Sequence, residues 1–199
     1  MKSVFKTLVF IGTFLIVTNG FSYNSNPEVF ISELVNDAIK TLANKNISIE
    51  EKKKKIEIIT LENVDINGIG MYTLGEARKS LNANDSTKYK ILFEKYFLKS
   101  LTSRLKDYSE QKFEVISSDR KSDIYTIVRS RVLESAKQPE LKISWRVYTK
   151  NMDKPLIRDL VVEGLSLART QKEEFASILN SNNNDINVLF SKLEDFIKD

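Results

Sequence analysis

Three short groups of residues have the types and spacing that catalysis can use. Residues 164–168 read Gly-Leu-Ser-Leu-Ala where a strand is expected to meet a helix, which approximates the serine elbow of the α/β-hydrolases. Ser118 and Lys121 have the spacing of a serine–lysine dyad. Asp159 and Glu163 are expected on one face of a strand, where two carboxylates can act as an acid and a base.

The composition removes most of the partners that these groups need. The 199 residues include no His and no Cys, so no imidazole can activate Ser166 and no thiolate or imidazole can bind a metal. A serine–lysine dyad should open a helix, whereas this one falls in an expected turn. Strand carboxylates more often pair with arginines on the neighbouring strand, here Arg129, Arg131 or Arg146. We therefore expect a protein that is not an enzyme and uses no cofactor or metal.

Residues 1–22 have the pattern of a secretory signal peptide. Lys2 and Lys6 precede the apolar run 8–17, and small residues follow at Gly20 and Ser22. The run has ten residues, whereas a membrane-spanning helix needs about 20. Loss of the two lysines lowers the formal net charge from +4 to +2, which disfavours a nucleic-acid partner. We expect export of residues 23–199 as a single domain that relies on an apolar core.

Helices are predicted at both ends of the exported chain. Asn26, Ser48 and Asp65 are N-cap signals for three helices, and Ser48 with Glu51 forms a capping box. A further helix is expected over residues 84–108. After the strands, one helix begins near Leu167 and a last one follows the N-cap Asp185.

Four strands are expected between these helices, at residues 113–117, 124–132, 141–148 and 157–165. Short turn clusters separate them, which indicates an antiparallel meander. Apolar and polar residues alternate over 141–148, so one face of that strand is apolar. The fold class is therefore α+β, with a four-stranded curved antiparallel sheet flanked by amphipathic helices.

Two features of the helices allow more than one interpretation. The helix over 84–108 carries an aromatic-rich stripe, which is either ordinary core or the lining of a cavity for a large apolar ligand. The run of Lys52, Lys53, Lys54 and Lys55 is interpreted as a solvated helix face, and attraction to an anionic membrane surface is the alternative.

Residues 159–179 read DLVVEGLSLARTQKEEFASIL. The sequence Val-Val-Glu-Gly-Leu-Ser-Leu followed by Phe-Ala-Ser-Ile-Leu resembles the signature of the MlaC family, the toluene-tolerance periplasmic phospholipid carriers. Residues 65–74 resemble the family's short helix before its long aromatic helix, and 113–115 resemble its first strand. The likeness spans residues 27–198. The chain departs from the family at Pro155 and Leu156, where an aromatic residue often enters the last strand.

This resemblance implies a monomeric periplasmic carrier that shuttles phospholipid between the outer and inner membranes and maintains outer-membrane lipid asymmetry. The implied partners are an outer-membrane lipoprotein–porin complex and an inner-membrane ABC transporter with an MCE-domain ring. It also implies that the sheet and helices enclose an apolar cavity for acyl chains. A periplasmic adaptor or binding module without a lipid cavity is the alternative.

The predicted lipid-binding residues are apolar and come from both sides of that cavity. From the helices they are Met71, Leu74, Phe93, Phe97, Leu101 and Leu105, and from the apolar face of the sheet they are Ile143, Trp145, Val147, Val161 and Leu165. The head group is expected near solvent. Arg129, Arg131 and Arg146 are available to steer its phosphate, although neutralising strand carboxylates is the favoured duty for each.

Overall fold

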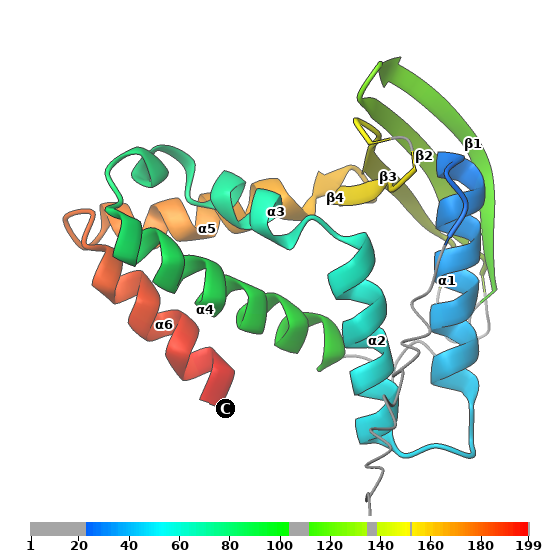
Figure 1. Ribbon diagram of the computed structural model, residues 1–199, viewed down its shortest axis with the longest axis horizontal. Coiled ribbons are helices and arrows are strands. Elements are labelled where there is room, and N and C mark those ends of the chain that lie inside the picture. Colours follow the sequence, from blue (N-terminus) through cyan, green and yellow to red (C-terminus); the bar gives the residue numbers. More distant parts are fainter. Residues whose placement is uncertain (1–22, 104–111, 135–138, 152, 199) are drawn as a thin grey trace, which may run out of the picture.

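The computed structural model describes residues 23–103, 112–134, 139–151 and 153–198 (Figure 1). The expected signal peptide, residues 1–22, lies outside them, as does Leu105. The helices are α1 (Pro27–Ala43), α2 (Ile49–Asn63), α3 (Ile66–Thr73), the 3₁₀ helix η1 (Gly75–Lys79), α4 (Ala83–Thr102), α5 (Leu167–Asn180) and α6 (Ile186–Lys198). The strands are β1 (Phe113–Ser122), β2 (Tyr125–Val132), β3 (Leu141–Tyr148), β4 (Leu156–Val162) and β5 (Leu165–Ser166).

The first three helices begin at the predicted N-caps. Asn26 Oδ1 accepts from the backbone N–H of Glu28 at 2.9 Å, and Asp65 Oδ1 accepts from that of Gly68 at 2.9 Å. Ser48 and Glu51 form the reciprocal capping box at the start of α2. These bonds satisfy backbone donors that have no partner inside the helix, which is why the starts are readable from local sequence.

The strands form one antiparallel sheet in the order β1-β2-β3-β4-β5, which confirms the α+β fold class. The expected count of four strands is wrong. Glu163 and Gly164 both take positive φ, at 47° and 85°, and turn the chain back on itself after Val162. A two-residue turn with this backbone is typical of a tight hairpin, so the predicted strand 157–165 divides into β4 and β5.

The described residues form two apolar clusters instead of one. The sheet core joins the sheet to α1 and α2 and consists of Phe30, Ile31, Leu34, Leu42, Ile56, Ile59, Val128, Val147 and Ile157. The helical core joins α3, α4, α5 and α6 and consists of Ile66, Ile69, Leu74, Tyr89, Leu92, Phe93, Ala168, Phe175, Leu179, Leu189, Phe190 and Leu193. Figure 1 shows the sheet with α1 on one side and α3–α6 on the other, with α2 between α1 and the C-terminal end of α4.

Polar contacts along β4 hold the two parts together. The backbone N–H of Asp65 donates to the carbonyl of Ile157 at 2.9 Å, and Arg158 Nε donates to Asp65 Oδ2 at 2.7 Å. One residue further along, the buried carboxylate of Asp159 accepts from Ser166 Oγ at 2.6 Å and from the Ala168 N–H at 3.0 Å. The starts of α3 and α5, where the chain passes between the sheet and the helices, are therefore both bonded to β4.

None of the helices in the described ranges has the length and apolar character that crossing a bilayer requires.

Candidate lipid-binding site

The groups with catalytic spacing have structural partners. Ser166 is the N-cap of α5, and its Oγ accepts from the Arg169 N–H at 3.1 Å while donating to Asp159. Glu163 lies in the β4–β5 turn and accepts from the Lys142 N–H at 2.5 Å, so it does not share a strand face with Asp159. The expectation that these two carboxylates lie on one face is wrong, because the strand ends before Glu163.

The serine–lysine spacing on β1 also has separate partners. Ser118 Oγ donates to Glu28 Oε2 at 3.0 Å, and Lys121 Nζ lies 2.5 Å from Asp119 Oδ2. The hydrogen bond from Lys121 lowers the pKa of Asp119. The serine and the lysine are thus engaged with different carboxylates.

The three strand arginines neutralise carboxylates, which confirms the favoured interpretation. Arg146 Nη1 lies 3.4 Å from Asp159 Oδ2, which is only 6% exposed, and Arg129 Nη2 lies 3.6 Å from Asp119 Oδ2. Arg131 pairs with Glu114 on β1 and with Glu140, whose Oε2 is 3.1 Å away. Because each guanidinium already has an anion, these arginines are poor candidates for binding a phosphate.

Four of the predicted helical residues fall in or beside the helical core. Leu74 and Phe93 are buried in it, and Met71 and Phe97 are partly buried against it. The centre is tight, since a Cβ on Gly70 of α3 would come within 2.7 Å of Phe93 Cδ1. Leu101, at the C-terminal end of α4, is 40% exposed. The apolar stripe of α4 therefore runs from a packed centre at Phe93 to an open end at Leu101.

The predicted sheet residues do not all share one face. Val147 is buried in the sheet core, Trp145 is partly buried against it, and Ile143 is half-buried. Trp145 is paired with Leu160, whereas Val161 is paired with Ser144. Directly paired residues project to the same side of a sheet, so Val161 lies on the face opposite Trp145, and the expectation that both line one wall is wrong.

Leu165 stands apart from the other predicted residues. It lies on the short strand β5 and is 68% exposed. The structure thus separates the predicted set into residues of the helical core, residues of the sheet core and exposed residues. The enclosing cavity itself stays a prediction.

Two residues of α2 that the sequence analysis missed extend the apolar surface between the cores. Ile58 and Leu61 are 39% and 47% exposed. With about 100° per residue, they lie on the side of α2 opposite Ile56 and Ile59, which face the sheet core. The sequence does contain a sign of these two residues, because apolar residues occur on both sides of α2. A helix that faces a single core carries only one apolar stripe.

The C-terminal end of α2 lies where the two cores approach each other. α2 contacts α4, and Figure 1 shows the C-terminal end of α4 reaching the side of α2 that faces away from α1. Val64, at the end of α2, packs against both cores. We call Ile58, Leu61, Val64, Phe97 and Leu101 the inter-core surface. Its side chains are apolar and incompletely covered, which suits the binding of an apolar ligand and supplies no reactive group.

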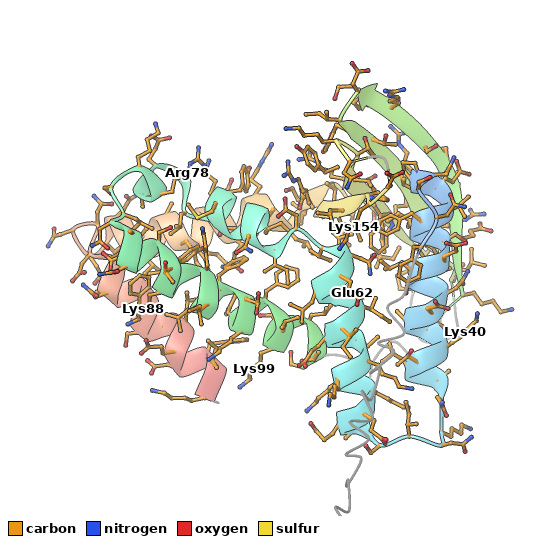
Figure 2. All side chains as sticks on the ribbon, in the orientation of Figure 1. Lys40, Glu62, Arg78, Lys88, Lys99 and Lys154 are labelled. Carbon is orange, nitrogen blue, oxygen red and sulfur yellow. The ribbon has the colours of Figure 1, made fainter. Side chains whose placement is uncertain are left out.

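A lysine near the C-terminal end of α4 is bonded to α6. Lys99, labelled in Figure 2, donates from Nζ to the carbonyl of Ile197 on α6 at 3.1 Å.

A surface depression of about 360 Å³ lies over the N-terminal half of α4, lined by Asn84, Thr87, Lys88, Ile91 and Leu92. Of the predicted lipid-binding residues that have described positions, none lines this depression.

Comparisons with known proteins agree with this architecture. A solved structure of a phospholipid-binding protein from Ralstonia solanacearum, in complex with a phospholipid, is similar with a TM-score of 0.72. It shares 15% sequence identity, and the alignment covers 84% of this chain and 94% of that one. At this identity the likeness shows a common fold. No curated protein sequence matches the chain.

The family comparison covers most of the chain. The sequence model of the MlaC protein family matches residues 32–195, which include the inter-core surface, the helical core and all of the sheet core except Phe30 and Ile31. The fold, the match and the signature at residues 159–179 agree, and the chain belongs to the MlaC family.

Proposed function

We propose that this protein binds a phospholipid and carries it through the periplasm between the outer and inner membranes, thereby maintaining outer-membrane lipid asymmetry. Its proposed partners are an outer-membrane lipoprotein–porin complex and an inner-membrane ABC transporter with an MCE-domain ring. Membership of the MlaC family supports this function. The observation that carries it is the incompletely covered apolar surface between two separate cores.

The physical need for a carrier comes from the acyl chains. Each methylene exposed to water costs about 0.8 kcal/mol, so two ordinary chains cost tens of kcal/mol. Noncovalent affinities saturate near about 20 kcal/mol. The protein therefore has to match the environment of a bilayer, which keeps the chains dry while small free-energy differences decide loading and release.

The proposed site places the acyl chains against the inter-core surface. Ile58 and Leu61 contribute from α2, Phe97 and Leu101 from α4, and Trp145 with Ile143 from the adjoining sheet face. The buried residues Leu74, Phe93 and Val147 support these walls from the two cores. Val161 and Leu165 are left out, because one lies on the opposite sheet face and the other is exposed at the sheet edge.

Native mass spectrometry of the exported protein tests this function. We expect the purified protein to retain a mass of phospholipid size in a fixed ratio, with the lipid identified in an organic extract. A second sample, stripped of lipid and refolded, should regain that mass from phospholipid vesicles. Protein that carries no lipid and takes up none would contradict the carrier and favour an adaptor.

A further inference from the structure

The four consecutive lysines of α2 differ in their partners. Lys52 Nζ donates to the carbonyl of Leu42 at the end of α1, at 2.6 Å. Lys53 Nζ donates to Glu50 Oε1 at 2.9 Å. Lys54 and Lys55 are exposed, and among the residues with described positions neither ammonium has a hydrogen bond or an ion pair. Two cations of this run are therefore available to an external anion.

The two available lysines share a helix face with the apolar residues of the inter-core surface. Lys54, Ile58 and Leu61 are spaced i, i+4 and i+7, and Lys55 precedes Ile58 by three residues. Lys54 thus lies one helical turn, about 5.4 Å, before Ile58 on the side of α2 that faces away from the sheet core, and Lys55 lies at the edge of that side, since it also precedes Ile59 of the sheet core by four residues. Along α2 from its N-terminal end, the two ammonium groups therefore come before the apolar side chains of Ile58 and Leu61.

We propose that Lys54 and Lys55 bind the phosphate of the lipid head group while the acyl chains lie against Ile58 and Leu61. This inference rests on the proposed function and assigns the polar end of that site. A phospholipid has its anion and its chains at opposite ends, in the same order as the groups on this face of α2. The lysine stems also extend the apolar surface, since four methylenes precede each ammonium.

The acidic residue one turn before Lys55 is already engaged. Glu51 lies one turn before Lys55 and accepts from Ser48 N at 2.8 Å and from Ser48 Oγ at 2.9 Å. The backbone hydrogen bond from Ser48 lowers the pKa of Glu51, and the nearby charge of Lys55 lowers it further, so the carboxylate of the capping box stays ionised. Unlike Lys54 and Lys55, the three strand arginines are paired with carboxylates and are not available to a phosphate.

A matched pair of double variants tests the assignment. Lys54→Gln/Lys55→Gln removes the two unpaired ammonium groups, and Lys40→Gln/Lys53→Gln removes two that pair with Asp37 and Glu50, so the net charge changes equally. The lipid-free proteins are titrated with short-chain phosphatidylglycerol below its micelle concentration and with the matching phosphate-free diacylglycerol. Urea unfolding confirms that each variant is folded.

We expect Lys54→Gln/Lys55→Gln to weaken phosphatidylglycerol binding about tenfold at low salt, with a smaller loss at high salt and no change for diacylglycerol. The control pair should change neither by more than about twofold. Equal affinities for the two double variants would overturn the assignment while leaving lipid binding intact. Wild-type protein that binds neither probe would overturn the proposed function and this inference with it.

A third arm separates the head group of a bound lipid from a membrane surface. The same proteins are sedimented with vesicles that contain phosphatidylglycerol. If Lys54→Gln/Lys55→Gln loses vesicle binding but keeps wild-type affinity for the short-chain lipid, the lysines dock the protein on a membrane and the head-group assignment is wrong.

Discussion

The two cores bury their apolar side chains by different means. The helical core is rich in stacked aromatic rings, with Tyr89 and Phe93 centroids 5.7 Å apart and the Phe93 and Phe175 rings edge to face at 6.3 Å. The sheet core is mainly aliphatic, with Val128, Val147 and Ile157 packed under α1 and α2. Each has fully buried residues at its centre and partly buried apolar residues around them, and Val64 belongs to the border of both. We therefore expect stability to depend mainly on the two centres, while the proposed lipid site lies at the border between them.

A polar contact inside the helical core shows how specific that centre is. The hydroxyl of Tyr89 donates to the carbonyl of Gly70 at 3.1 Å and lies 2.8 Å from Thr73 Oγ1. Burial raises the pKa of Tyr89, which keeps its proton on the hydroxyl. A buried hydroxyl with partners fixes α4 on α3 in a way that apolar contact alone does not.

The strongest test of the centre compares two phenylalanines one turn apart on α4. Phe93→Ala should lower the free energy of unfolding by about 3–5 kcal/mol, because Phe93 is fully packed. Phe97→Ala should cost about 1–2 kcal/mol, because its ring is partly buried. Urea denaturation measures both. Equal losses would remove the distinction between centre and border.

The link between the two parts should be the next most sensitive. Asp159→Asn weakens the buried acceptor of Ser166 Oγ, the Ala168 N–H and Arg146, so we expect about 2–3 kcal/mol lower stability. Asp123→Asn is the control, since Asp123 is exposed and pairs only with Arg120 at 3.1 Å among its described contacts. Thermal unfolding of both variants checks this, and similar melting temperatures would show that the Asp159 anchor contributes little.

A smaller effect is expected at the open end of the sheet core. Trp145 Nε1 donates to Ser130 Oγ at 2.8 Å, and Trp145→Phe removes that bond while keeping an aromatic ring. We expect a loss of about 1 kcal/mol. The same change in a Ser130→Ala background should cost measurably less, and additive losses in this double-mutant cycle would show that the bond is energetically silent.

The smallest effect on stability should accompany the largest effect on lipid content. Ile58→Gln and Leu61→Gln alter exposed side chains, so unfolding free energies should change by less than about 0.5 kcal/mol. The lipid retained in native mass spectra should fall severalfold, because polar groups then face the acyl chains. Ile116→Gln on β1 is the control, since Ile116 is also exposed but lies away from α2 and α4. Unchanged lipid content in both α2 variants would place the chains elsewhere.

Much of the fold was predictable because the relevant interactions are local. The caps at Asn26, Ser48 and Asp65 involve partners within three residues, and they begin helices where expected. The alternation over Leu141–Tyr148 is a local pattern too, and β3 has these bounds. The helix predicted to continue to residue 108 is described only to Thr102 as α4, and residues 104–111 lie outside the described residues.

The candidate site was less predictable, because it depends on which surfaces meet. The face of Val161 follows from its pairing with Ser144, which no run of neighbouring residues reveals. Gly164 fits the start of a serine elbow in the sequence, whereas in the structure it lies in the turn that joins β4 to β5. Ile58 and Leu61 gain meaning only when α2 lies between the sheet core and α4.

By itself, the sequence determined the helix starts, the antiparallel class of the sheet and the family, because each is written in short patterns or a contiguous signature. Only the tertiary structure decided that the interior divides into two cores and that α2 lies between the sheet core and α4. The physical reason is that hydrophobic burial has no direction along the chain. Apolar residues specify that they must be covered, and the packing of distant elements decides by what.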